Sequence, residues 1–250
     1  MFILFALVFM RMTGAIALNP ILGRSNIPNP VKGAMILVLS FLLYGGTDGV
    51  LTHEPAFMLE FGFMLIKELM VGFVIGFSME LSFAVVRFAA AVLDYIMGLS
   101  MAQTYLPQYT TQMTITSGMF YTFLVLLFLA GDGHVRLMAL IYHSARLIPF
   151  GEVMIRPELS TLMVEIFKTS IATGLQLAFP ILAMELVTES AVGILMRIIP
   201  QINVFAVNFQ LKIIVGLMML LYMFSPIASK MYTIIDNLFL YIEEALRLMV

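Results

Sequence analysis

The residues of this sequence that could do chemistry are charged side chains set within long apolar stretches. Lys67 and Glu68 occur in FMLEFGFMLIKELMVGFVIGFSMEL, and Gly72 and Gly76 follow Glu68 at intervals of four residues. On a helix, this spacing places Glu68 and both glycines on one face. Glycines four residues apart let another helix come close. A charge inside a membrane costs about 2.5–3.5 kcal/mol, so it normally faces protein or water. We expect either a structural ion pair in a helix interface or a site in a conducting path.

More charged residues occur in the later apolar segments. Glu165 and Lys168 are three residues apart and can pair on one helix. Glu185 and Glu189 are four residues apart and repel each other unless a basic group, a proton or another chain compensates them. Such charges fit a multi-subunit helical assembly or an ion-coupled secondary transporter that uses intramembrane carboxylates. Transporters of that kind are commonly built from two related halves, which this sequence does not display, so the transporter is the alternative.

Motifs for catalysis, metal binding and nucleic-acid binding are missing from the sequence. The stretch 53–57 begins like the zinc motif H-E-x-x-H, but Phe57 stands at the second ligand position. Neither a G-x-S-x-G elbow nor a phosphate-binding G-x-x-x-x-G-K-[ST] loop occurs. The chain has no Cys, and its formal net charge of −2 offers no basic face to phosphates. We expect no enzyme activity, no cofactor and no nucleic-acid partner.

The elements that must position these residues are membrane helices. The chain of 250 residues is 62% apolar and 11% charged, with a mean hydropathy of +1.04, whereas soluble domains carry about 25% charged residues. Apolar segments cover 2–18, 32–45, 57–79, 82–101, 118–142, 161–187 and 211–234. We expect 57–79 and 82–101 to form a tight hairpin, and Pro180 and Pro226 to kink their segments. The sequence predicts an all-α integral membrane protein of helical hairpins with broken and kinked helices, in a single domain over 1–250, built to pack in a multi-subunit complex.

The distribution of basic residues predicts the orientation in the membrane. Arg and Lys occur in 19–32, in 143–160 and near the C-terminus, whereas 102–117 has neither and 46–56 is acidic. The positive-inside rule then places the C-terminus in the cytoplasm and the N-terminus outside. Ala15-Ile16-Ala17 resembles a signal-peptide cleavage site. However, Arg11 interrupts the apolar run and no basic region precedes it, so we expect a retained first helix. The last stretch, DNLFLYIEEALRLMV, predicts an amphipathic helix at the cytoplasmic interface.

Two polar but nearly uncharged stretches separate apolar runs. MGLSMAQTYLPQYTTQMTITSGMF, residues 97–120, fits either burial inside a protein-lined passage or an ordinary external loop. RIIPQINVFAVNFQLK, residues 197–212, places a proline and amide side chains between two apolar runs. Broken backbone at membrane depth is tolerated where protein buries it. We therefore expect a structural role for this second stretch.

Several motifs, in their order and spacing, resemble the FliR family, the R subunits of the flagellar type III export gate, and its injectisome counterpart. The resemblance covers nearly the whole chain. It is carried by Arg11-x-x-Gly14 with Pro20 and Pro28, Lys67-Glu68-Leu69-x-x-Gly72-x-x-x-Gly76, Gly98-Leu99-Ser100-Met101-Ala102, Leu127-Phe128-Leu129-x-x-x-Gly133-His134, Ser144-x-x-x-x-Pro149-x-Gly151 and Arg197-x-x-Pro200-Gln201-x-Asn203-Val204-Phe205.

The resemblance implies a subunit that forms and seals a channel through which unfolded flagellar proteins cross the bacterial inner membrane, at the flagellar basal body. The implied partners are the P-type and Q-type gate subunits, the B-type switch subunit, the unfolded cargo and membrane lipid. In such an assembly, some apolar segments lie inside the protein complex rather than across the bilayer. The family's plug loop maps onto 106–116, and Leu106 stands where other members often have Asp.

The resemblance and the residue patterns together give two sets of candidate site residues besides the intramembrane charges. The plug and pore candidates are Met101, Leu106, Pro107, Gln108, Tyr109, Gln112 and Met113. The assembly candidates are Lys67, Glu68, Gly72, Gly76, Gly133, His134, Pro149, Gly151, Arg197, Pro200, Gln201, Asn203 and Phe205.

Overall fold

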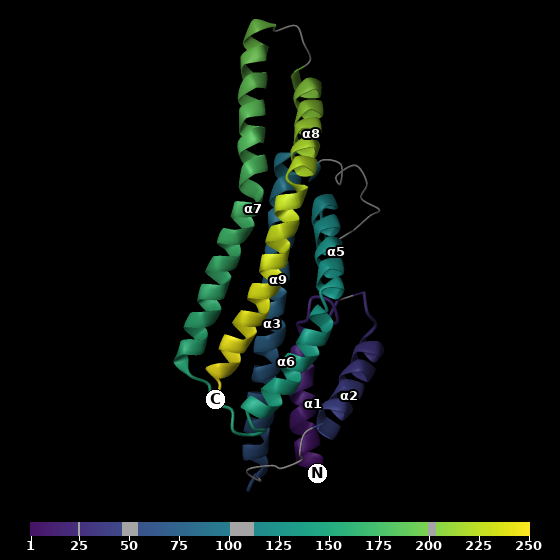
Figure 1. Cartoon of the computed structure of the whole chain (residues 1–250), viewed down its shortest axis with the longest axis vertical. Helices are drawn as coiled ribbons and strands as arrows, with labels where there is room; N and C mark the ends of the chain where they lie inside the picture. Colours follow the sequence, from purple (N-terminus) through teal and green to yellow (C-terminus); the bar gives the residue numbers. More distant parts are fainter. Residues whose placement is uncertain (25, 47–54, 101–112, 200–203) are drawn as a thin grey trace. The chain divides into compact units, whose positions relative to one another are not determined.

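The fold consists of helices alone throughout the part of the chain that a computed structural model describes, residues 1–24, 26–46, 55–100, 113–199 and 204–250 (Figure 1). The helices are α1 (Phe2–Ala17), α2 (Asn29–Gly46), α3 (Met58–Ile96), α5 (Ile115–Ala130), α6 (Gly133–Leu147), α7 (Pro157–Ile198), α8 (Val204–Tyr222) and α9 (Phe224–Arg247). The prediction of an all-α protein is confirmed.

Within the described part of the chain, three helices, α2, α3 and α7, are long and apolar enough to cross a membrane. Up to five spans result if α5 with α6, and the main part of α8 with α9, each count as one bent span. The membrane character predicted from composition is therefore also a property of the individual helices.

The helix α3 differs from the predicted hairpin of 57–79 and 82–101, because it is one continuous helix of 39 residues. That prediction was wrong, since no Gly or Pro occurs between Gly76 and Gly98 to break the chain. The helix ends where Gly98 adopts a φ of 76° and donates its N–H to Tyr95 O. A glycine in this left-handed conformation is a common helix terminator.

Two sharp bends confirm the prediction of broken helices. The first, of 67°, separates α5 from α6 at 131–132, where Asp132 has a φ of 54°. The second, of 60°, separates α8 from α9 at Met223. Pro226 therefore stands in the first turn of α9, where its missing N–H removes no helical hydrogen bond. Pro180 lies inside α7, which continues through it.

The described residues group into two compact units. Unit 1 comprises Met1–Phe83, Phe128–Lys168 and Ile235–Val250, and unit 2 comprises Ala84–Leu127 and Thr169–Ile234. Each unit contains residues that are distant in sequence, so neither is a simple stretch of the chain. The single domain over 1–250 stays a prediction.

The end of the chain packs in unit 1 as the amphipathic pattern predicts. In α9, Leu238, Ile242 and Ala245 are fully buried, while Glu243 and Glu244 are exposed. On the exposed side, Arg136 of α6 lies 3.1 Å from Asp236 and stacks over the ring of Phe239.

One contact in unit 1 disagrees with the predicted sides of the membrane. The Tyr142 hydroxyl of α6 donates to the carbonyl of Gly46, the last residue of α2. The charge pattern predicts that 46–56 and 143–160 lie on opposite sides of the membrane. Gly46 and Tyr142, at the edges of these two segments, are instead in contact. Counting charges treats each apolar run as one crossing, whereas α5 and α6 are bent. The orientation of the two termini stays a prediction.

Candidate functional site

Helices α1 and α3 cross in unit 1 at glycines, with their backbones in contact. A Cβ added to Gly72 would lie 2.0 Å from the carbonyl oxygen of Arg11, and one added to Gly14 would lie 2.4 Å from that of Leu69. A Cβ on Gly76 would lie 3.0 Å from carbonyl oxygens of α1. Even a methyl group at Gly72 or Gly14 would therefore push the two helices apart.

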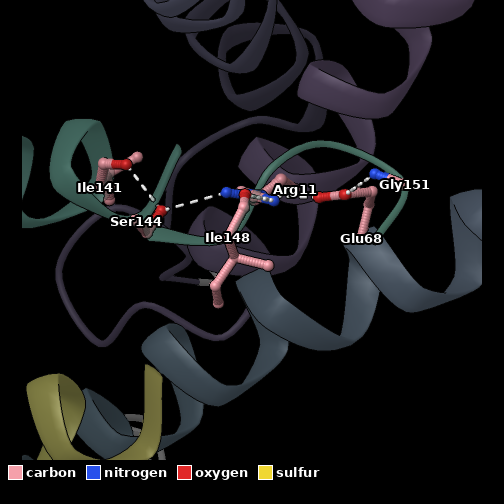
Figure 2. Close-up of polar contacts among 6 residues, drawn as sticks. All are labelled: Arg11, Glu68, Ile141, Ser144, Ile148 and Gly151. Atoms are coloured by element: carbon pink, nitrogen blue, oxygen red, sulfur yellow. Dashed lines mark hydrogen bonds and ion pairs between the residues drawn. The ribbon is translucent and has the colours of Figure 1, made fainter. Parts of the chain in front are cut away.

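The close crossing positions a buried ion pair, which Figure 2 shows. The Arg11 Nε of α1 donates to Glu68 Oε2 of α3 at 2.6 Å, and neither side chain has any exposed surface. Arg11 is three residues before Gly14, and Glu68 is four residues before Gly72, so both side chains start within one turn of the crossing. The cation that pairs with Glu68 is thus 57 residues away in sequence, and is not the adjacent Lys67.

Both terminal nitrogens of Arg11 donate hydrogen bonds as well. Its Nη1 donates to Ser144 Oγ of α6 at 3.4 Å, and its Nη2 donates to Ile148 O at 3.1 Å (Figure 2). The Phe150 ring centroid lies 4.3 Å from Arg11 Cζ, in cation–π contact. Ser144 itself donates to Ile141 O at 2.7 Å, which holds its hydroxyl in place.

The second oxygen of Glu68 binds the turn that follows α6. Glu68 Oε1 accepts the N–H of Gly151 at 2.9 Å, and Gly151 has a φ of 95°, a conformation that favours glycine (Figure 2). Ser144, Pro149 and Gly151, which belong to one motif of the sequence, thus flank the buried pair. Pro149 itself is exposed.

This arrangement fastens α1, α3, α6 and the turn after α6 to one another. A guanidinium keeps its charge in proteins, and each Glu68 oxygen already accepts a hydrogen bond. Removing one member of a buried pair costs about 3–5 kcal/mol, because the other charge is left uncompensated. Of the two interpretations of Glu68, the geometry supports a structural ion pair.

Unit 2 contains the two carboxylates of α7 that are four residues apart in sequence, Glu185 and Glu189. Lys212 Nζ of α8 lies 3.0 Å from Glu189 Oε1, so a cation compensates Glu189. Glu185 is 1% exposed, and neither of its carboxyl oxygens has a hydrogen-bond partner among the described residues. A Cβ on Gly216 of α8 would lie 2.9 Å from Glu185 Oε1, so the two helices pack closely at this carboxyl group.

The other predicted residues of the described part lie apart from these two clusters. Glu165 and Lys168 are both exposed on α7, and no ion pair joins them in the described part of unit 1. Gly133 is buried at the start of α6, and a Cβ there would lie 2.5 Å from Phe128 Cδ2. Lys67 and Met113 are partly exposed, and His134 and Arg197 are exposed.

Several predicted residues fall outside the described part of the chain. These are Met101, Leu106, Pro107, Gln108, Tyr109, Gln112, Pro200, Gln201 and Asn203. Phe205 belongs to α8. Their roles in plugging and assembly stay predictions.

Sequence reasoning missed the partner of Glu68. Arg11 was noted as an interruption of the first apolar run and as part of the motif Arg11-x-x-Gly14, but not as the partner of Glu68. The signal that could have found it was a cation one turn from Gly14 in an apolar helix. In the described residues, no group of three or more His, Cys, Asp or Glu is placed to hold a metal ion.

Comparisons with known proteins cover almost the whole chain. Residues 2–238 match the family described as "Bacterial export proteins, family 1". The flagellar biosynthetic protein FliR of Escherichia coli (strain K12) is 25% identical over 232 residues, 92% of this chain and 88% of the relative. FliR of Bacillus subtilis (strain 168) is 27% identical over 248 residues, 97% of this chain and 93% of the relative. FliR of Pectobacterium carotovorum subsp. carotovorum is 28% identical over 233 residues, 92% and 88% of the two chains.

Proposed function

We propose that this chain, which belongs to the FliR family of bacterial export proteins, is a subunit of the flagellar type III export gate. Family membership makes it a component of flagellar biosynthesis and protein export in the bacterial inner membrane. The finer proposal is that it helps form and seal the channel for unfolded flagellar proteins at the basal body. Its proposed protein partners are the P-type and Q-type gate subunits and the B-type switch subunit.

The match over residues 2–238 carries this proposal, and the surface of α7 supports the assembly. The helix has 42 residues and thus a length of about 63 Å along its axis, whereas the hydrocarbon core of a bilayer is about 30 Å thick. Only 17% of the most apolar stretch of 18 residues in α7 is buried within the chain. Large apolar side chains are exposed from Val164 through Phe179 to Ile198. Lipid can cover about half of this length, and helices of other subunits are the natural cover for the rest.

The α1–α3 crossing supports the same proposal from another direction. Neither side chain of the buried pair of Arg11 and Glu68 has any exposed surface, so the pair is not placed to contact cargo. The pair instead makes unit 1 rigid. A subunit whose packing surfaces must match those of its neighbours requires such a rigid unit.

The sealing role is proposed for residues 106–116, which lie mostly outside the described residues. No charged residue occurs between Ala102 and Ser117. A fixed charge in a constriction would attract counter-ions and water, so an uncharged loop suits a seal that a polypeptide can displace. Pro107 restricts the loop through its fixed φ, and Met101 and Met113 can fill irregular gaps.

Deleting residues 107–114 tests the sealing role. We expect the complex to assemble and the cells to leak small ions and grow poorly. Asn203→Ala is the comparison variant, because it should mainly reduce assembly. The measurement is membrane permeability to ions in cells with quantified complex levels. A tight membrane with full levels of the deletion complex would mean that this stretch is an ordinary external connection.

The ion-coupled transporter remains the alternative, and Glu185 is the observation that favours it. A carboxyl group that is buried without a partner among the described residues is a feature of ion pathways as well as of unassembled interfaces. The two functions differ in what purifies with the chain. An isolated homo-oligomer that moves ions in vesicles favours the transporter, and a mixed helical complex favours the export gate.

A further inference from the structure

Asp94 is a buried carboxylate of unit 2 that the proposed function does not yet use. It lies near the end of α3, two residues before the last residue of that helix, and has no exposed surface. Its Oδ2 accepts the backbone N–H of Thr116 at 2.8 Å, and its Oδ1 accepts the Thr116 hydroxyl. Both hydrogen bonds are buried and join residues 22 apart in sequence.

Asp94 caps α5 in place of α5's own residues. Thr116 is the second residue of α5, and its N–H is one of those that a helix leaves without an internal partner. The first turn of α5 contains no acidic residue. The hydroxyl of Thr114, which precedes the helix, is buried without a partner among the described residues. A carboxylate from α3 therefore performs the function that an N-cap side chain usually performs.

The contact also compensates part of the negative charge of Asp94. A helix N-terminus carries a partial positive charge equivalent to roughly half an elementary charge, and hydrogen bonds to ionised groups are about twice as strong as neutral ones. Next to it, Ser117 donates its hydroxyl to Arg87 O at 3.2 Å, a second link between α5 and α3. The carboxylate is thus held without exposing a charge to solvent.

The other end of the connection between α3 and α5 is fixed as well. Met97 has no exposed surface and donates its N–H to Leu93 O at 2.9 Å. A Cβ on Gly216 of α8 would lie 2.5 Å from Met97 Cγ, and one on Gly98 would lie 3.4 Å from the ring of Phe209. Residues of α8 therefore hold the end of α3, while Asp94 holds the start of α5.

We propose that Asp94 is a positioning residue whose carboxylate fixes the start of α5 against the end of α3. It thereby also fixes the C-terminal end of 106–116, the segment to which sealing is assigned. Its effect on sealing rests on the proposed function, whereas its effect on α5 does not. The inference explains why a chain with a charge-free loop places an ionisable residue just before that loop. The charge serves the helix terminus rather than the passage.

Asp94→Asn in the full complex tests this inference. The amide keeps the size of the side chain but loses the charge, and its NH2 group replaces one of the two oxygens that accept from the Thr116 N–H and hydroxyl. Amide hydrogen exchange at 115–118 should quicken roughly tenfold to a hundredfold, the change expected when a hydrogen bond to a charged group is lost. Ion permeability of the cells should rise at unchanged complex levels. Asp132→Asn, at an exposed residue whose left-handed backbone Asn tolerates, is the matched control and should change neither quantity.

A second pair of variants keeps the test valid if Asp94→Asn does not assemble. Thr116→Ser keeps the hydroxyl and should resemble the unmodified protein. Thr116→Val keeps the backbone donor but loses the hydroxyl donor, so exchange and ion leak should both increase. Equal behaviour of the two variants would overturn the inference.

The outcomes separate this inference from the sealing role itself. If the 107–114 deletion leaks but assembled Asp94→Asn is tight, the positioning role is refuted and the sealing role stands. If exchange at 115–118 is unchanged in Asp94→Asn, the inference is refuted whatever the leak. If the deletion is tight, the sealing role fails and the effect of Asp94 on sealing fails with it, while hydrogen exchange still tests whether Asp94 fixes the start of α5.

Discussion

Arg11→Met should destabilise this protein severely, although the change replaces a cation by an apolar residue in an apolar helix. The substitution leaves the Glu68 carboxylate fully buried with the Gly151 N–H as its remaining partner. Breaking a buried pair in this way costs about 3–5 kcal/mol. That loss lowers the ratio of folded to unfolded protein by roughly two to three and a half orders of magnitude, out of a total stability of about 5–15 kcal/mol.

Removing both charges should be less damaging than the sum of the single changes. In Arg11→Met with Glu68→Leu neither charge of this pair remains, and well-packed apolar residues often replace such pairs at little cost. The carbonyl of Ile148 and the N–H of Gly151 then lose their partners, at about 1–3 kcal/mol each. The double variant should therefore be at least as stable as Arg11→Met alone, but less stable than the unmodified protein.

The assay is the thermal unfolding midpoint of the detergent-solubilised complex, together with its yield. Lys230→Met is the matched control, because it removes a cation at an exposed position of α9 and leaves the pair of Arg11 and Glu68 intact. Most surface substitutions change stability by about 0.5 kcal/mol or less, so this control should behave like the unmodified protein. Equal midpoints for Arg11→Met and Lys230→Met, or additive losses in the double variant, would mean that the buried pair does not stabilise the protein.

Three further predictions concern other parts of the molecule. Gly72→Leu or Gly76→Leu should prevent assembly, and even Gly72→Ala should reduce the yield of the complex, because its Cβ would lie 2.0 Å from a backbone oxygen. Gly62→Ala is the control on the same helix, since a Cβ there would meet nothing within 4 Å, and equal yields for Gly72→Ala and Gly62→Ala would contradict the close packing at Gly72. Glu185→Gln should leave complex yield and thermal midpoint unchanged or raised, since it removes a charge buried without a partner among the described residues; loss of the complex would mean that another subunit binds the carboxylate. A reporter fused after Val250 should read as cytoplasmic, and an external reading would reject both the orientation and the placement of α9 at the cytoplasmic interface.

The sequence predicted those parts of the structure that depend on local composition. Apolar runs specify helices, and the glycines at 72 and 76 mark where a second helix comes close. The break between α5 and α6, which falls inside the predicted apolar segment 118–142, was not predicted, although Gly131-Asp132-Gly133 was a local signal for it. The polar and apolar faces of α9 follow directly from the spacing of its residues.

Features that depend on distant partners could not be predicted in the same way. Nothing in the neighbourhood of Glu68 points to a cation 57 residues earlier, and the adjacent Lys67 was the more obvious partner. The hydrogen bond of Tyr142 to Gly46 joins residues 96 apart, so charge counting assigned their surroundings to opposite sides of the membrane. The continuous α3 was missed because two apolar runs of membrane length suggested two crossings.

The same limit applies to Asp94. From the sequence it was one more charge in an apolar segment, because the residue that explains it, Thr116, lies on the far side of a long polar stretch. The tertiary contact determines whether such a carboxylate belongs to a passage or to a helix terminus.

Co-purification most directly tests the claim that this chain is an export-gate subunit. The tagged chain is expressed with and without the P-type and Q-type subunits of its own organism, extracted in mild detergent and weighed intact by native mass spectrometry. We expect one mixed complex that contains all three kinds of subunit when they are expressed together, and no stable homo-oligomer when the chain is expressed alone. A stable homo-oligomer of this chain, with the P-type and Q-type subunits recovered separately, would contradict it.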